Sequence, residues 1–181
     1  MDTTTTIAVI VVVALVIIAA LVWVFARKRR SRHLRSQFGP EYDHAIRELG
    51  SQSKAETALA ARERRMEKVH IRSLTSEERE SYSKRWHDVQ AKFVDDPPGA
   101  IRDADALVNM TMQTRGYPMG EFEARAENLS VDHPKVVRNY RAARVIAVRQ
   151  DRGEATTEDL RHAMVYYRDL FEELLEYQGV R

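Results

Sequence analysis

Residues 7–26 read IAVIVVVALVIIAALVWVFA, twenty consecutive residues without a charged or strongly polar side chain. At about 1.5 Å of rise per residue, a helix of this length spans the roughly 30 Å hydrocarbon core of a bilayer. A surface helix of a soluble domain would carry a polar face, which this stretch lacks. The stretch therefore predicts one N-terminal transmembrane helix at residues 7–26, preceded by a short tail at residues 1–6.

The residues that flank the apolar stretch favour a retained anchor over a cleaved signal peptide. A signal peptide has basic residues before its apolar run and a small-residue cleavage site after it. Here Met1, Asp2 and four threonines precede the run, and Arg27 and Lys28 follow it. We therefore expect a single-pass membrane protein.

A basic segment at residues 27–37 follows the apolar stretch. Basic residues near a membrane span stay on the cytoplasmic side, so the amino terminus is predicted outside and the C-terminal domain in the cytoplasm. The simplest interpretation of the segment is a stop-transfer signal, and the alternative is binding of anionic lipid head groups. The predicted membrane-interface residues are Trp23, Arg27, Lys28, Arg29, Arg30, Arg32 and Arg35.

Residues 38–181 are predicted to form one soluble domain, because a single domain most often has about 100 to 150 residues. Of the 29 Lys and Arg residues, six lie in residues 1–35, and of the 27 acidic residues only Asp2 does. The remaining 23 basic and 26 acidic residues leave no cationic surplus for nucleic-acid binding. The chain has no Cys, which excludes disulfides, thiolate metal sites and a Cys nucleophile.

Helix-start and helix-stop residues divide this domain into amphipathic helices, with no alternating strand pattern. Gly39-Pro40 separates the membrane segment from the domain, and capping boxes begin at Thr75 and Thr156. The fold class is therefore predicted as all-α, a small antiparallel helical bundle behind one membrane helix. Helices are expected at about residues 41–49, 53–69 and 121–129. Four further helices are expected to start at Thr75, at Asp96-Pro97-Pro98, at Asp132-His133-Pro134 and at Thr156, with apolar stripes such as Tyr82, Trp86, Val89 and Phe93 or Leu160, Met164, Tyr167, Phe171 and Leu174.

Two Glu-x-x-His pairs have the spacing that di-metal helical bundles use, namely Glu41 with His44 and Glu67 with His70. Solvated acid and histidine side chains that pair locally on a helix explain the same spacing. We favour that interpretation, so no metal and no cofactor is predicted, and these four residues are only weak candidate ligands.

Asp132-His133-Pro134 offers a second candidate for chemistry, with His133 as a general base oriented by Asp132. Adjacent residues rarely face one another as such a dyad requires. The favoured interpretation is a helix start, with Asp132 as the cap and Pro134 in the first turn. Because no nucleophile or phosphate-loop motif accompanies it, no enzymatic activity is predicted.

Two Gly-containing loops are predicted to contact a partner. One consists of Phe38, Gly39 and Pro40, and the other of Arg115, Gly116, Tyr117 and Pro118. Loops presented by a rigid scaffold commonly carry binding functions. Each loop is also fully explained as a helix stop, which is the interpretation we favour.

A further set of motifs is spread along the soluble domain, at residues 38–43, Trp86, Gln90, residues 93–95, residues 115–118, residues 132–134, residues 139–141 and residues 157–161. This set resembles a family of uncharacterised bacterial single-pass membrane proteins, whose members are labelled hypothetical, membrane or secreted proteins. The similarity covers nearly all of residues 38–181. It implies no activity, cofactor or catalytic residue.

Together these patterns predict a membrane-tethered helical interaction or adaptor module at the inner face of the bacterial membrane. Its expected partners are the lipid bilayer, anionic lipid head groups and an unidentified protein, without nucleic acid. Two alternatives stay open: a metal-dependent helical-bundle enzyme that uses the Glu-x-x-His pairs, and a sensor of a small apolar ligand bound among the aromatic residues.

Overall fold

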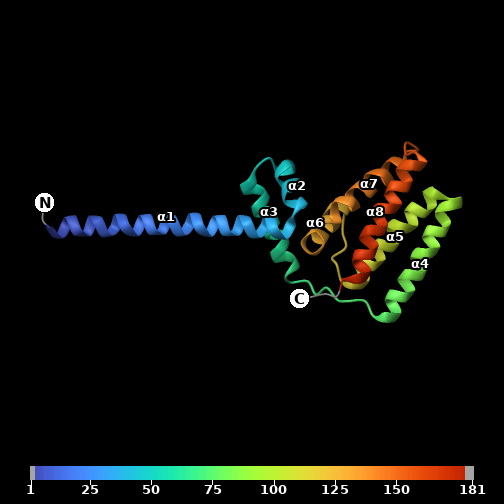
Figure 1. The fold of residues 1–181 in the computed structure, drawn as a ribbon, viewed down its shortest axis with the longest axis horizontal. Helices are drawn as coiled ribbons and strands as arrows, with labels where there is room; N and C mark the ends of the chain where they lie inside the picture. Colours follow the sequence, from blue (N-terminus) through green and yellow to red (C-terminus); the bar gives the residue numbers. More distant parts are fainter. Residues whose placement is uncertain (1–2, 178–181) are drawn as a thin grey trace. The chain divides into compact units, whose positions relative to one another are not determined.

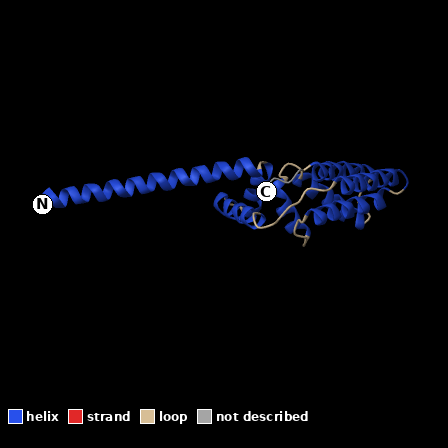
Figure 2. Cartoon of the chain, turned by 90° about the horizontal axis from the view of Figure 1, so that it is seen from below, coloured by secondary structure: helices blue, strands red, loops and turns tan. Residues whose placement is uncertain are grey.

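The computed structural model describes the backbone of residues 3–177 and the side chains of residues 12–177. Within this range every regular element is a helix, and loops join the helices without a strand (Figure 2). The predicted all-α class and helical bundle are therefore confirmed. The helices are α1 (Thr3–Phe38), α2 (Pro40–Leu49), α3 (Gln52–Met66), α4 (Ser76–Asp95), α5 (Pro97–Arg115), α6 (Phe122–Asp132), α7 (Val137–Asp151) and α8 (Thr157–Glu176).

The chain divides into two compact units, residues 1–37 and residues 38–181. The second unit begins at Phe38, where the sequence places the start of the soluble domain. Gly39 lies at this boundary with a φ of 46°, a conformation that glycine adopts easily because it has no Cβ. Pro40 then occupies the first position of α2, where its missing N–H leaves no hydrogen bond unmade.

Helix α1 carries the apolar stretch and the basic segment in one continuous helix. Its large apolar side chains between Val12 and Phe25 are 51 to 68% exposed. Among the helices that the structure describes, none combines the length and the apolar character that crossing a membrane requires. The span predicted for residues 7–26 is thus not supported by the described residues, and the side chains of its first five residues, 7–11, lie outside them. Of the predicted tail, residues 1–2 lie outside the described residues and residues 3–6 belong to α1.

Helices α4, α5, α7 and α8 form the largest packed group of the second unit (Figure 1). Trp86 of α4 stacks on Phe171 of α8 with 4.7 Å between ring centroids, and both side chains are buried. The predicted apolar stripe of α8 is buried along its whole length. On α4 only Trp86 and Val89 of the predicted stripe are buried, because Tyr82 and Phe93 lie at its edge.

Both predicted capping boxes are present. The Thr75 hydroxyl accepts from the Glu78 N–H while the Glu78 carboxylate accepts from the Thr75 N–H, and Thr156 and Asp159 make the same pair of contacts. Arg72 adds two hydrogen bonds of 2.7 Å to Glu78. These contacts lower the pKa of the Glu78 carboxyl to about 2, so this carboxylate stays ionised at the start of α4.

Gly116 ends α5 with a φ of 92°, as its predicted role as a helix stop requires. The Tyr117 N–H then bonds the Met112 carbonyl at 3.0 Å. A Cβ at Gly116 would lie 2.8 Å from the His70 carbonyl oxygen, because the segment between α3 and α4 passes close by. The same segment donates the Arg72 N–H to the Arg115 carbonyl at 2.9 Å.

Helices α2, α3 and α6 form a second group, in which the α2–α3 hairpin packs on α6 and α2 also reaches α7. In the sequence, Arg62 interrupts the apolar stripe of Ala55, Leu59 and Met66 on α3, a pattern that predicts a partly solvated helix face. In the structure the Arg62 side chain is only 6% exposed. The cause is a set of acidic partners supplied by other helices.

Candidate functional site

A buried ionic network joins four helices around Glu41, whose side chain is 2% exposed. One carboxylate oxygen of Glu41 lies 3.0 Å from Nη1 of Arg62 on α3, and the other lies 2.6 Å from Nη1 of Arg141 on α7. Arg62 also reaches Glu127 of α6 at 2.8 Å, and Arg141 reaches Glu123 of α6 at 2.6 Å. Each guanidinium therefore bridges two carboxylates, which offsets the cost of burying these charges.

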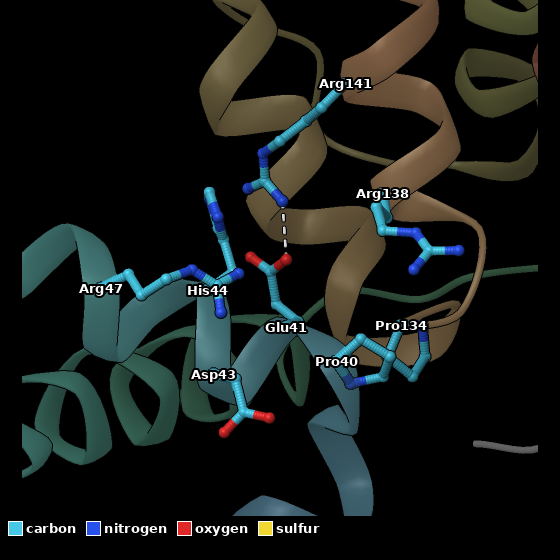
Figure 3. A pocket seen from close by; sticks show the side chains of 8 residues that line it. All are labelled: Pro40, Glu41, Asp43, His44, Arg47, Pro134, Arg138 and Arg141. Carbon is cyan, nitrogen blue, oxygen red and sulfur yellow. Dashed lines mark hydrogen bonds and ion pairs between the residues drawn. The ribbon is translucent and has the colours of Figure 1, made fainter.

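Beside this network lies a pocket of about 370 Å³ between α2 and the start of α7 (Figure 3). Its volume falls within the roughly 300 to 1,000 Å³ typical of small-molecule sites. The α2 side chains come from one side and the α7 side chains from the other. The lining residues are Pro40, Glu41, Asp43, His44, Arg47, Pro134, Arg138 and Arg141.

The cations of this pocket differ in how far they are neutralised. Arg141 is committed to Glu41 and Glu123, and His44 lies 3.7 Å from Glu48. Arg47 and Arg138 are exposed and have no ion-pair or hydrogen-bond partner for their guanidinium groups among the described residues. The structure thus leaves two uncompensated positive charges on the pocket.

The start of α7 adds to this positive character. Its first turn contains no acidic residue, and its N-cap residue, Val136, makes no side-chain cap. The positive end of a helix dipole normally attracts acidic side chains, yet here Arg138 stands in the first turn. Pro134 precedes the helix and forms part of the pocket wall.

The structure places Asp132 and His133 differently from the favoured sequence interpretation. Asp132 is the last residue of α6, and α7 begins only at Val137, so Asp132 does not cap that helix. The prediction of a helix start at Asp132-His133-Pro134 is wrong. Turn residues 134–136 intervene, because the His133 side chain is drawn into the interior.

The His133 ring, whose side chain is 0% exposed, is held between two helical groups. Nδ1 lies 3.0 Å from Glu173 of α8, and Nε2 lies 3.0 Å from the Tyr117 hydroxyl, which donates to Asp132 at 3.2 Å. Burial lowers the pKa of His133, and the nearby Glu173 carboxylate opposes that shift. Burial also raises the pKa of Tyr117, so its phenol stays protonated.

Arg115 adds a buried cation to the same region. Its Nη1 donates to the Leu174 carbonyl at 2.5 Å and its Nε to the Arg72 carbonyl at 3.2 Å, while the guanidinium lies 4.7 Å from the Tyr177 ring centroid. Nη2 makes no hydrogen bond to any residue that the structure describes. Burial lowers the pKa of Arg115. These contacts tie the end of α5 to α8 and to the segment that follows α3.

The four weak metal candidates are not brought together. Glu41 is occupied by two arginines, His44 pairs with Glu48, and Glu67 and His70 are exposed at and beyond the end of α3. Within the described residues no group of three or more His, Asp or Glu side chains is arranged to hold a metal ion. The two Glu-x-x-His pairs therefore lie in different surroundings, one on α2 and the other at the end of α3.

The predicted partner loops are largely internal. Phe38, Arg115 and Tyr117 are buried, Gly39 and Pro118 are half-buried, and only Pro40 and Gly116 are exposed. The predicted membrane-interface residues lie along α1, where the Arg27 guanidinium sits 5.4 Å from the Trp23 ring centroid. Partner and lipid contacts of these residues stay predictions.

Sequence reasoning missed the residues that shape the pocket and the network, chiefly Arg47, Glu123, Arg138 and Arg141. One signal was available: two arginines three residues apart open a helix that has no acidic residue in its first turn. Such a start contradicts the usual charge preference of helix termini. Their convergence with Glu41, one hundred positions away, depends on the tertiary fold.

Comparison with known proteins finds no matching family model, no matching curated protein and no matching solved structure. The resemblance of residues 38–181 to a family of bacterial membrane proteins therefore stays a prediction.

Proposed function

We propose that the chain is a membrane-tethered helical interaction module, an adaptor whose domain is held at the inner face of a bacterial membrane. The observation that carries this proposal is the exposure of the apolar side chains of α1. Apolar side chains cover every side of the helix from Val12 to Ala26, so no single partner face could bury them all. A lipid environment removes this surface from water without such a partner.

The full apolar stretch of the sequence, residues 7–26, supports the same proposal by its length. It corresponds to about 30 Å of helix, the thickness of the hydrocarbon core. The following arginines and lysine on α1 are exposed, as head-group contacts require. Their position favours an outer amino terminus and a cytoplasmic domain.

The adaptor role is supported by the organisation of the second unit. Its core is filled by aromatic and aliphatic side chains, and the pocket between α2 and α7 is lined mainly by charged side chains. That lining favours a charged partner group over an apolar ligand. No residue constellation described above favours a second function.

Thiol labelling in intact cells tests the anchor and its orientation, because the chain contains no Cys of its own. Thr4→Cys should react with a membrane-impermeant reagent, whereas Ser81→Cys, at an exposed position of α4, should react only after the cells are permeabilised. Labelling of Ser81→Cys alone in intact cells would reverse the topology. Release of the protein from membranes by alkaline carbonate, without detergent, would contradict the proposal that α1 anchors the chain in the bilayer. Crosslinking in the native membrane, followed by capture of the full chain, then tests for a protein partner.

A further inference from the structure

The pocket between α2 and α7 combines three features that point to an anionic ligand. It is large enough for a small molecule, it carries the two unpaired guanidinium groups of Arg47 and Arg138, and it lies at a helix start without acidic residues. The guanidinium groups and the helix start add positive potential to the same place. We name this site the Arg47–Arg138 pocket, with the lining residues given above.

The acidic residues of the pocket do not cancel this potential. The Glu41 carboxylate is shared between Arg62 and Arg141, both within hydrogen-bonding distance, so it carries no free negative charge toward the cavity. The Asp43 carboxylate points away from the arginine side chains in Figure 3. The lining therefore keeps two arginines that no described carboxylate neutralises, Arg47 and Arg138.

The chemistry of the two arginines selects the class of anion. A guanidinium presents parallel N–H donors that match two oxygens of a phosphate group, and two such groups balance a dianion. The start of α7 contributes the positive end of a helix dipole, which also favours phosphate. We propose that the Arg47–Arg138 pocket binds a phosphomonoester, with its phosphate on Arg47 and Arg138 and the rest of the ligand against Pro40 and Pro134.

The phosphate could belong to a soluble phosphomonoester or to the exposed head group of phosphatidic acid. Both present the same dianionic group, and the pocket chemistry recognises that group alone. The proposal is independent of the membrane anchor, since every lining residue belongs to the second unit. Failure of the labelling experiment above would therefore leave it standing.

The test uses the full chain in nanodiscs of phosphatidylcholine, titrated with inorganic phosphate by calorimetry at constant ionic strength maintained with chloride. The variants are Arg47→Gln and Arg138→Gln. The matched control is Arg152→Gln, which removes an arginine that is also exposed and has no ion-pair partner among the described residues, at the opposite end of α7. Circular dichroism of each variant confirms that the helices are retained.

We expect the wild-type chain and Arg152→Gln to bind phosphate equally, and each pocket variant to lose about tenfold or more in affinity. Nanodiscs that contain phosphatidic acid then separate the two sources. Weaker binding of free phosphate in them assigns the pocket to the lipid head group, and unchanged binding assigns it to a soluble phosphomonoester. Absence of phosphate binding to the wild-type chain, or equal affinity in Arg138→Gln and Arg152→Gln, would overturn the proposal.

Discussion

The group formed by α4, α5, α7 and α8 and the group formed by α2, α3 and α6 are stabilised by different forces. The first is packed mainly by apolar and aromatic side chains, such as the stacked pair of Trp86 and Phe171. The second is joined to α7 by charges that alternate in sign, with Glu41 at their centre. Apolar packing depends mainly on the area buried, whereas a buried ion pair depends on each partner being present.

This difference has a functional consequence. Residues 40–47 provide one wall of the Arg47–Arg138 pocket, and the ionic network holds that wall against α7. A substitution in the network should therefore shift the α2 wall of the pocket. The apolar group, in contrast, holds α7 in place.

The largest effect is expected from Trp86→Ala in the apolar group. Loss of a buried indole leaves a cavity, so the free energy of unfolding should fall by about 3 to 5 kcal/mol. Denaturant unfolding followed by circular dichroism measures this loss. Val94→Ala on the same helix is the control, because Val94 is 82% exposed and should cost less than about 0.5 kcal/mol. Equal losses of stability for the two substitutions would show that Trp86 does not lie in the core.

Glu41→Gln is the corresponding change in the ionic group. It leaves two buried guanidinium groups with one carboxylate each, so we expect a loss of about 3 kcal/mol, at the lower end for breaking a buried ion pair. Glu158→Gln, which breaks an exposed pair with Arg161, should change the stability far less, because solvent screens that pair. Hydrogen exchange should show faster exchange in α2 and α3 and little change in α4. Uniform acceleration across all helices would contradict the separation of the two groups.

Gly116→Ala tests the connection between the groups, where the segment after α3 passes the end of α5. An alanine here would be strained in the left-handed backbone conformation, and its Cβ would also lie 2.8 Å from the His70 carbonyl oxygen. The free energy of unfolding should therefore fall by about 2 kcal/mol. Gly153→Ala has a similar backbone with a φ of 72° and no atom within 4 Å of the new Cβ, so about 1 kcal/mol is expected. Thermal unfolding of both variants measures the difference, and a larger loss at Gly153 would contradict it.

The smallest effect concerns pH and His133, which lies among Tyr117, Asp132, Glu173, Arg115 and the Tyr177 ring. Because burial lowers its pKa in the folded state, the unfolded chain binds more protons just below the ordinary value of 6.5. The stability that comes from the neutral His133 ring should therefore be fully present above pH 6.5. It should be lost as the pH falls below 6.5 toward the lowered pKa of His133. His133→Gln should flatten this part of the stability curve relative to the wild type. A wild-type stability that rises on acidification below pH 6.5 would show that Glu173 outweighs burial.

Much of the helical architecture could be predicted because its signals are local. Capping boxes at Thr75 and Thr156 and the stop at Gly116 depend only on residues a few positions apart. The buried stripe of α8 follows from helical periodicity. The start of α7 was mispredicted at Asp132 because the burial of His133, which is bonded to Glu173 forty positions later, outweighed the local capping preference.

The sequence by itself therefore determined the helical class, most helix boundaries, the chain boundary at Gly39-Pro40 and the apolar and basic character of α1, since each depends on neighbouring residues. Only the tertiary structure decided that Arg62 is buried, that Glu41 is an ion-pair centre and that Arg47 and Arg138 share one pocket. The physical reason is that a charged side chain has the same local pattern whether it faces water or a distant partner. Which of the two it meets depends on contacts that span as many as one hundred positions, from Glu41 to Arg141.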